Sequence, residues 1–333
     1  MTTAVALGVT PTCPRTRPAP RRSSRARGPA SSRAIVPRAG PDDESAKPAS
    51  FSGSNSVLRA LCPLLKVFSG GDAAAPRNRF LEVATSGLAS ISRLPFGVTV
   101  QPECAARPAE RSPAKPIVLY EFEACPFCRR VREIATQLDL ELVVKPCPKD
   151  AATHRDEAFA LGNAQRTFPF LVDENKRERG APLCMNESAS ICEYLWNEYG
   201  EGAPFPNAVV TSTPFTGWMP TLLRAGRGMT RYANADVPVT SASDEKPKVT
   251  LYNYEGNQFA RLVREALCEL EVPYVLANAG KGSARREELR SIDADASVPY
   301  LVDENTGVRL GESDRIVAYL FETYGGRAGG AEA

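Results

Sequence analysis

Residues 168–175 read FPFLVDEN, and residues 298–305 read VPYLVDEN. Both stretches combine a proline, an apolar run and an Asp-Glu-Asn end, which is typical of a strand that enters a hairpin turn. The same pattern therefore occurs twice, 130 residues apart. A repeat over this distance predicts two copies of one structural unit within the chain.

The similarity extends toward the N-terminal side of each stretch. Residues 117–120 (IVLY) and 249–252 (VTLY) are short apolar runs with β-branched residues, as buried strands require. Each run is followed by an amphipathic helix pattern, with apolar residues on one face from 127 to 138 and from 259 to 270. A second short strand is expected after each helix.

On the C-terminal side, the pairs Glu187-Ser188 and Glu312-Ser313 each open a helix. The spacing between the copies falls here from 130 to 125 residues, which places a five-residue insertion in the hairpin of the first unit. The predicted fold class is α/β, with two units of β-α-β-α-β-β-α. We assign the units to residues 116–200 and 248–325.

Two segments outside the units have weaker patterns. Residues 51–114 mix apolar pieces with glycines and prolines, and we predict a poorly defined helical or linker segment there. Residues 201–247 are rich in Pro, Thr, Ser and Ala, and we predict a linker with one possible helix around residues 215–232. We expect this helix to dock on the rest of the chain.

The N-terminus differs in composition from the rest of the chain. Residues 1–41 hold eight arginines and no acidic residue, and they lack the apolar core of a secretory signal. Such a composition is typical of organelle transit peptides. We predict a transit peptide over residues 1–50 and a location in the chloroplast stroma, with the mitochondrion as the alternative. A disordered basic tail would have the same composition.

The remaining residues set limits on partners. Beyond residue 41 the chain has 33 basic and 39 acidic residues, so its charge gives no indication of nucleic-acid binding. No run of eighteen apolar residues indicates a membrane span. Nine cysteines at irregular spacing argue against a framework of structural disulfides.

One cysteine pair stands between the first strand and the first helix of the first unit, where residues 125–128 read CPFC. A thiolate at a helix N-terminus faces unpaired N–H groups, which lower its pKa. Cys125 is therefore the expected nucleophile, and Cys128 is the expected thiol that resolves a mixed disulfide. The same positions of the second unit hold Asn257 and Ala260, which excludes thiol chemistry there.

Other interpretations of these motifs remain open at this point. CPFC is also half of a zinc site, but the other cysteines and His154 do not pair with it at ligand spacing, so we predict no metal. Pro169 predicts a cis peptide bond after Phe168, which would leave the Phe168 backbone open to a bound peptide. Glu187 and Ser188 either cap a helix or bind a ligand carboxylate at its N-terminus.

Together these motifs resemble the N-terminal domain of glutathione S-transferases in its glutaredoxin-like form. The resemblance covers residues 116–200 and 248–325, and the CPFC turn also occurs in glutaredoxins and in type-2 prostaglandin E synthase. The tandem arrangement behind a leader looks like a plastid family with paired domains of this type. It implies two tandem thioredoxin-like domains without the full helical C-terminal domain of a transferase.

The resemblance also implies an activity, that of a glutathione-dependent thiol–disulfide oxidoreductase acting on disulfides or glutathionylated proteins. Cys125 and Cys128 would be catalytic, and glutathione, the co-substrate, would contact Phe168, Pro169 and the pair Glu187-Ser188. The alternatives are a non-catalytic module that binds glutathione or a partner, a heme or iron–sulfur carrier, and a conjugating transferase. The proline of CPFC argues against a cluster, and the missing helical domain argues against a transferase.

The sequence departs from the glutaredoxin pattern at one position. Glutaredoxins usually place a lysine two residues before the first cysteine to hold a glutathione carboxylate, and this chain has Glu123 there. Arg129, Arg130 and Arg166 are the candidates to replace that lysine. The second unit keeps Pro299 and its Glu-Ser pair, and we predict that it is a scaffold, with glutathione binding as the alternative.

Overall fold

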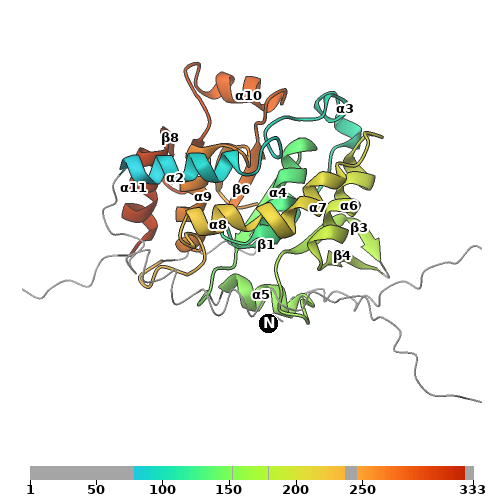
Figure 1. The fold of residues 1–333 in the computed structure, drawn as a ribbon, viewed down its shortest axis with the longest axis horizontal. Helices are drawn as coiled ribbons and strands as arrows, with labels where there is room; N and C mark the ends of the chain where they lie inside the picture. Colours follow the sequence, from blue (N-terminus) through green and yellow to red (C-terminus); the bar gives the residue numbers. More distant parts are fainter. Residues whose placement is uncertain (1–78, 152, 179, 237–245, 327–333) are drawn as a thin grey trace, which may run out of the picture.

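The computed structural model describes residues 79–151, 153–178, 180–236 and 246–326 (Figure 1). The predicted transit peptide over 1–50, and the part of 51–114 that precedes residue 79, lie outside the described residues. Within the described ranges, no helix is long and apolar enough to cross a membrane.

Both predicted units are present. The elements of the first module are β1 (Ile117–Glu121), α4 (Pro126–Gln137), β2 (Glu141–Pro146), α5 (Thr153–Ala160), β3 (Phe170–Glu178), β4 (Ala181–Met185) and α6 (Ser188–Tyr199). Those of the second module are β5 (Val249–Asn253), α9 (Gln258–Glu269), β6 (Tyr274–Asn278), α10 (Arg285–Ile292), β7 (Tyr300–Asp303), β8 (Val308–Gly311) and α11 (Ser313–Tyr324). The predicted order β-α-β-α-β-β-α is confirmed, and the predicted insertion lengthens the β3–β4 hairpin.

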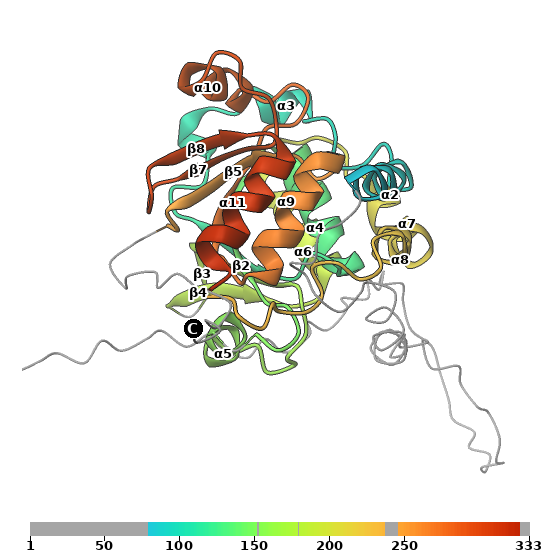
Figure 2. The same cartoon turned by 90° about the vertical axis from the view of Figure 1, so that its left-hand side faces the viewer.

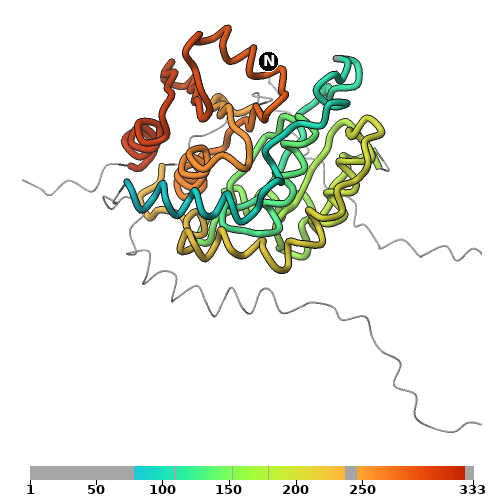
Figure 3. The backbone as a smooth tube through the Cα atoms, turned by 45° about the horizontal axis from the view of Figure 1, so that its top comes forward, coloured from blue at the N-terminus to red at the C-terminus, as the bar shows by residue number. Residues whose placement is uncertain are grey.

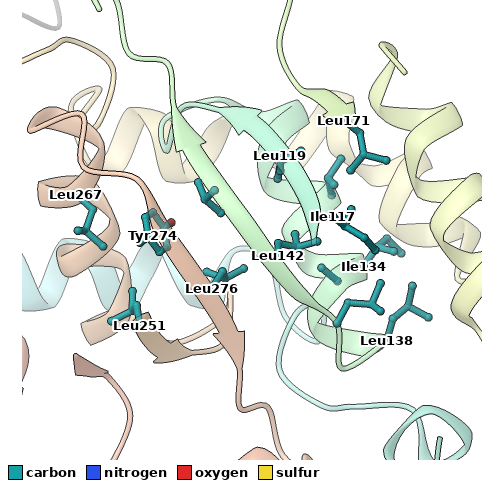
Figure 4. Close-up of a cluster of buried hydrophobic side chains, with 14 of the residues drawn as sticks. Ile117, Leu119, Ile134, Leu138, Leu142, Leu171, Leu251, Leu267, Tyr274 and Leu276 are labelled. Carbon is teal, nitrogen blue, oxygen red and sulfur yellow. The ribbon is translucent and has the colours of Figure 1, made fainter. Parts of the chain in front are cut away.

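The two modules share one eight-stranded sheet, in the order β4-β3-β1-β2-β6-β5-β7-β8. β2 and β6 pair antiparallel, with Leu142 opposite Leu276, so the sheet continues from one module into the other. Helices α4, α6, α9 and α11 cover one face, and α5 and α10 lie on the other (Figure 2). The apolar side chains under the four helices form one core that spans both modules (Figure 4).

The repeated VDEN segment has a structural reason. The buried Asp173 accepts hydrogen bonds from the hydroxyls of Tyr194, at 2.8 Å, and Tyr199, at 2.6 Å. Asp303 accepts from the two equivalent tyrosines of α11. Each aspartate also accepts from the asparagine two residues later, so one side chain joins the hairpin turn to the last helix of its module.

An arm precedes each module. The first arm contains α2 (Arg79–Ile91), α3 (Pro102–Ala105) and a 3₁₀ turn (Ala109–Arg111), and the second contains α7 (Asn207–Thr216) and α8 (Trp218–Leu223). The linker was predicted to hold one helix around 215–232, and its described residues hold two short helices, the second of which ends at Leu223. Ala225, Gly226 and Gly228 follow at positive φ, so the backbone leaves the helical conformation there.

The arms are exchanged between the modules. α2 precedes the first module but packs on α9 of the second, and α7 and α8 precede the second module but pack on α4 of the first. The arms also lie side by side, with α2 against α8 (Figure 3). Each module therefore carries the arm of its neighbour over the N-terminal half of its first helix.

Candidate active site

Cys125 is the residue that caps the N-terminus of α4. Its backbone is extended, and its sulfur accepts a hydrogen bond from the backbone N–H of Cys128 at 3.4 Å. The thiol of Cys128 also donates to this sulfur, so the two side chains of the predicted dithiol face each other. Pro126 occupies the first helical position, where its missing N–H costs nothing.

The two thiols have opposite acidities. Burial by itself raises the pKa of Cys125, but the hydrogen bonds from Cys128 and from the backbone of Cys128 and Phe127 outweigh it and lower that pKa below its ordinary value. Burial, together with the bond that Cys128 donates to Cys125, raises the pKa of Cys128 well above its ordinary value. This order matches the predicted roles, since the more acidic thiol is the attacking one.

The structure brings Phe168 and Pro169 to the dithiol, as predicted. The peptide bond between them is cis, and the equivalent bond before Pro299 is cis as well. The sulfur of Cys125 lies 3.9 Å from the carbonyl oxygen of Phe168. These two residues therefore form the wall of the turn beside the Cys125 sulfur.

Glu187 and Ser188 lie at the N-terminus of α6, where the sequence predicts either a helix cap or a contact with a ligand carboxylate. The Glu187 side chain is exposed and makes no capping hydrogen bond, and its backbone lies at φ 67°. Ser188 is buried, and its hydroxyl accepts hydrogen bonds from the guanidinium of Arg130, at 2.9 Å from Nε. The hydroxyl is therefore held by the protein itself, and Arg130 is directed to Ser188.

The second arm covers the dithiol turn, so only 2% of Cys125 is exposed. Thr221 of α8 donates to the carbonyl of Ala124 at 2.5 Å, and Trp218 packs edge-on against the ring of Phe127. Gly217, between α7 and α8, lies so close to the turn that a Cβ there would stand 3.3 Å from Pro126. The sequence predicts that a helix of this segment docks on the rest of the chain, but its apolar pattern does not indicate that it docks over the dithiol turn.

Glu123 has a structural role that explains its departure from the glutaredoxin pattern. It is buried between the modules, where it pairs with Arg132 at 2.8 Å and with Arg264 of the second module at 3.1 Å. Four buried arginines, two from each module, lie around it: Arg129, Arg132, Arg261 and Arg264. A lysine in place of Glu123 would add a fifth cation to this cluster. Of the proposed replacements, Arg129 is one of these four, and it pairs with Glu255 at 3.5 Å.

In the second module Asn257 takes the place of Cys125. Its side-chain oxygen accepts from the backbone N–H of Phe259 at 2.8 Å and of Ala260 at 3.0 Å, which caps α9. Its side-chain nitrogen donates to the carbonyl of Val298 at 3.2 Å. The asparagine thus keeps the shape of the turn and satisfies its polar groups without a thiol.

The fold of the two modules agrees with a family model of known proteins. Residues 119–203 and 251–328 match the family model described as glutathione S-transferase, N-terminal domain. A 74-residue stretch is 34% identical to Glutathione S-transferase 2 of Anopheles gambiae, and it covers 22% of this chain and 32% of that protein. The alignment with Leishmania TDR1, a trimeric glutathione transferase, covers 65% of this chain and 71% of that one at 14% identity, with a TM-score of 0.20.

The match to the family model gives the class of the two modules. The chain carries two thioredoxin-like domains of the glutathione S-transferase N-terminal type, joined into one sheet. It matches about a third of the length of the mosquito transferase. In the described residues, no full helical C-terminal transferase domain follows either module.

Proposed function

We propose that this protein is a glutathione-dependent thiol–disulfide oxidoreductase in which Cys125 is the nucleophile. The observation that carries the proposal is the Cys125 sulfur at the start of α4, which accepts hydrogen bonds from Cys128. Such donors stabilise a thiolate. The match of both modules to a glutathione S-transferase domain supports glutathione as the co-substrate.

The proposed reaction is the reduction of a glutathionylated substrate. The Cys125 thiolate attacks the glutathione sulfur, a Cys125–glutathione disulfide forms, and the substrate leaves as a thiolate that takes up a proton. In one route a second glutathione attacks the glutathione sulfur of this disulfide, expels the Cys125 thiolate and leaves as glutathione disulfide. In the other route the Cys128 thiol attacks the Cys125 sulfur and expels glutathione, and two glutathione molecules then reduce the Cys125–Cys128 disulfide. The two electrons come from two glutathione molecules, which end as glutathione disulfide.

The experiment is turnover of the mixed disulfide of glutathione and 2-mercaptoethanol, coupled to glutathione reductase. Cys125→Ser should abolish turnover, whereas Cys192→Ser, at a buried cysteine outside the turn, should keep it. Cys128→Ser separates the routes: retained activity indicates that glutathione resolves the intermediate, and lost activity indicates that Cys128 does. Absence of turnover by the unmodified, fully reduced protein would contradict the proposal.

A non-catalytic binding module is the second candidate, and the cover over Cys125 favours it. With only 2% of Cys125 exposed, a substrate reaches the sulfur only if α7 and α8 move. Calorimetric titration with glutathione distinguishes the two candidates. Binding that survives Cys125→Ser, without turnover by the unmodified protein, would support the binding module.

The proposed place of action is the plastid stroma, on the composition of residues 1–50. Fusion of these residues to a fluorescent protein tests the proposal. Import into chloroplasts is the expected result, and import into mitochondria or retention in the cytosol would contradict it.

A further inference from the structure

The outer side of the two arms is apolar. α2, α7 and α8 form the outermost layer of the molecule, over α4 and α9 (Figure 2). Five large apolar side chains of these helices are exposed, from 42% for Met219 to 81% for Phe215, and the other three are Leu81, Leu88 and Leu222. Exposed apolar side chains that gather on one surface mark an interaction site.

The polarity of these helices is the reverse of that of an ordinary surface helix. α2 buries Ser86, Ala89 and Ser90, and α8 buries Pro220 and Thr221. The larger apolar side chains lie on the other side of each helix. A helix that packs only on its own domain places its apolar stripe toward the core. The outer side of the arms is therefore suited to a further apolar contact.

The apolar stripe of the second arm runs through both of its helices. Gly217, between α7 and α8, has helical backbone angles (φ −62°, ψ −26°), so the helical path continues across it. Phe215, Met219 and Leu222 are spaced by four and three residues, which places them on one side. The two exposed leucines of α2 are seven residues apart and also share one side. Because α2 packs against α8, we treat these five side chains as one surface, the arm face.

The sequence that precedes α2 contains a matching apolar stripe. Apolar residues at positions 57, 58, 61, 64, 65 and 68 recur at spacings of three and four, which predicts one side of an amphipathic helix. Arg59 and Lys66 fall on the opposite side of this pattern. Pro63 also falls on the polar side, where its ring would bend a helix without interrupting the stripe.

The segment 57–68 is close enough in the chain to reach the arm face. Ten residues, 69–78, separate it from α2, and they include Gly70 and Gly71 but no large apolar side chain. Ten residues span at most about 35 Å, and the 13 residues of α2 are about 20 Å long. A short tether also gives the segment an effective concentration of about millimolar, which favours it over a separate partner.

We propose that residues 57–68 dock as an amphipathic helix on the arm face, with their apolar stripe against Leu88, Phe215 and Met219. Burial of apolar surface on both sides drives this contact. The docked segment lies outside α8, the helix that covers Cys125. The contact uses neither thiol of the dithiol turn, so it stands or falls independently of the proposed oxidoreductase activity.

The test is hydrogen exchange of the full-length protein, measured by mass spectrometry on peptides from residues 57–68. A segment variant combines Leu61→Ser with Leu65→Ser, and a face variant combines Leu88→Ser with Phe215→Ser. In both variants we expect these peptides to exchange about tenfold faster than in the parent protein, which corresponds to about 1.4 kcal/mol of lost docking. Arg59→Ser is the matched control, because it introduces the same residue on the polar side of the segment, and it should leave the exchange unchanged.

Oxidation of Met219 by hydrogen peroxide tests where the segment docks. The sulfoxide should form several-fold faster in the segment variant than in the parent protein or in Arg59→Ser. The substitutions of the segment variant lie outside both modules, so this comparison does not depend on their stability.

Three results would overturn the proposal: peptides 57–68 that exchange at the rate of an unfolded chain in the parent protein, equal exchange in the parent and in a face variant that keeps the parent's thermal midpoint, or equal oxidation of Met219 in the parent and the segment variant. Protection of residues 57–68 that rises with protein concentration would assign the arm face to a second copy of the chain, and it would overturn the proposal as well.

Discussion

Arg132 of the first module contacts Glu255 of the second at 2.8 Å, and both side chains are buried. The reverse contact joins Arg264 of the second module to Glu123 of the first at 3.1 Å. Arg132 and Arg264 are 132 residues apart in the sequence, and so are Glu123 and Glu255. The two contacts are therefore equivalent, and each module contributes one arginine and one glutamate. This is the geometry of a two-fold symmetric dimer, here within a single chain.

The first prediction concerns the strength of this junction. Glu255→Gln removes a carboxylate from a cluster of buried arginines and leaves their charges uncompensated. Loss of one partner in a buried ion-pair network costs about 3 kcal/mol or more. We expect a free energy of unfolding lower by that amount, measured by urea denaturation at pH 7.

The control for this measurement is Glu304→Gln, at an exposed position of the second module. It should change the free energy of unfolding by less than about 0.5 kcal/mol. A loss of less than 1 kcal/mol in Glu255→Gln would show that the network does not hold the modules together.

The second prediction follows from the asymmetry of the same cluster. Glu121 has Asn253 as its counterpart, and the amide oxygen of Asn253 accepts from Arg264 at 2.9 Å, so a neutral side chain suffices there. Burial raises the pKa of Glu121 to about 7, against the lowering effect of Arg132. The folded state therefore binds a proton more tightly than the unfolded state, and stability falls as the pH rises from about 4.5 to 7.

Glu121→Gln should remove the part of this pH-dependent loss of stability that comes from ionisation of Glu121. Relative to the parent protein, we expect the variant to gain up to about 3 kcal/mol between pH 4.5 and pH 8. Urea midpoints across this range measure the difference, with the exposed Glu322→Gln as the control. An equal pH dependence in parent and variant would show that Glu121 is ionised throughout.

The repeated units were predictable from the sequence because their signals are local. The apolar runs at 117–120 and 249–252, the CPFC turn and the two prolines each fix a strand, a helix start or a turn through nearby residues. The shared sheet was not predictable in this way. It depends on the pairing of β2 with β6, which are 130 residues or more apart in the sequence. The apolar pattern of a strand does not indicate which other strand it pairs with.

Helical segments were predicted before each module, but the equivalence of the two arms was missed although it carries a signal. Residues 93–99 (RLPFGVT) and 224–230 (RAGRGMT) share the pattern Arg-x-x-x-Gly-x-Thr. Arg93 pairs with Glu133 and Arg224 with Glu265, and both loops lie between the modules. Comparison of the segments before each unit would have extended the repeat. The exchange of arms between modules would still have required the structure.

The third prediction concerns the acidity of Cys125. Cys128→Ala removes the thiol that donates to the Cys125 sulfur but keeps the backbone N–H of the same residue. Because that thiol lowers the pKa of Cys125, we expect this pKa to be higher in the variant than in the parent protein. The pH profile of iodoacetamide alkylation, followed by mass spectrometry of the Cys125 peptide, measures this pKa. The same profile in parent and variant would assign the lowered pKa to the backbone alone.

The last prediction concerns the access of reagents to the dithiol. Trp218 packs against Phe127 at the end of the turn, with ring centroids 6.2 Å apart, and α8 holds the turn through Thr221. Trp218→Ala removes the aromatic contact and should loosen α8. We expect alkylation of Cys125 to become about tenfold faster, since that corresponds to about 1.4 kcal/mol of lost packing.

Met219 is the matched control, because it neighbours Trp218 on α8 but is 42% exposed. Met219→Ala should leave the alkylation rate of Cys125 unchanged. If both variants react at the rate of the parent protein, α8 is not the barrier, and the slow step lies in the first module itself. If Trp218→Ala also increases turnover of the glutathione mixed disulfide, the cover over Cys125 limits catalysis. In that case the second arm must move away from the dithiol turn before the protein reaches its full rate of turnover.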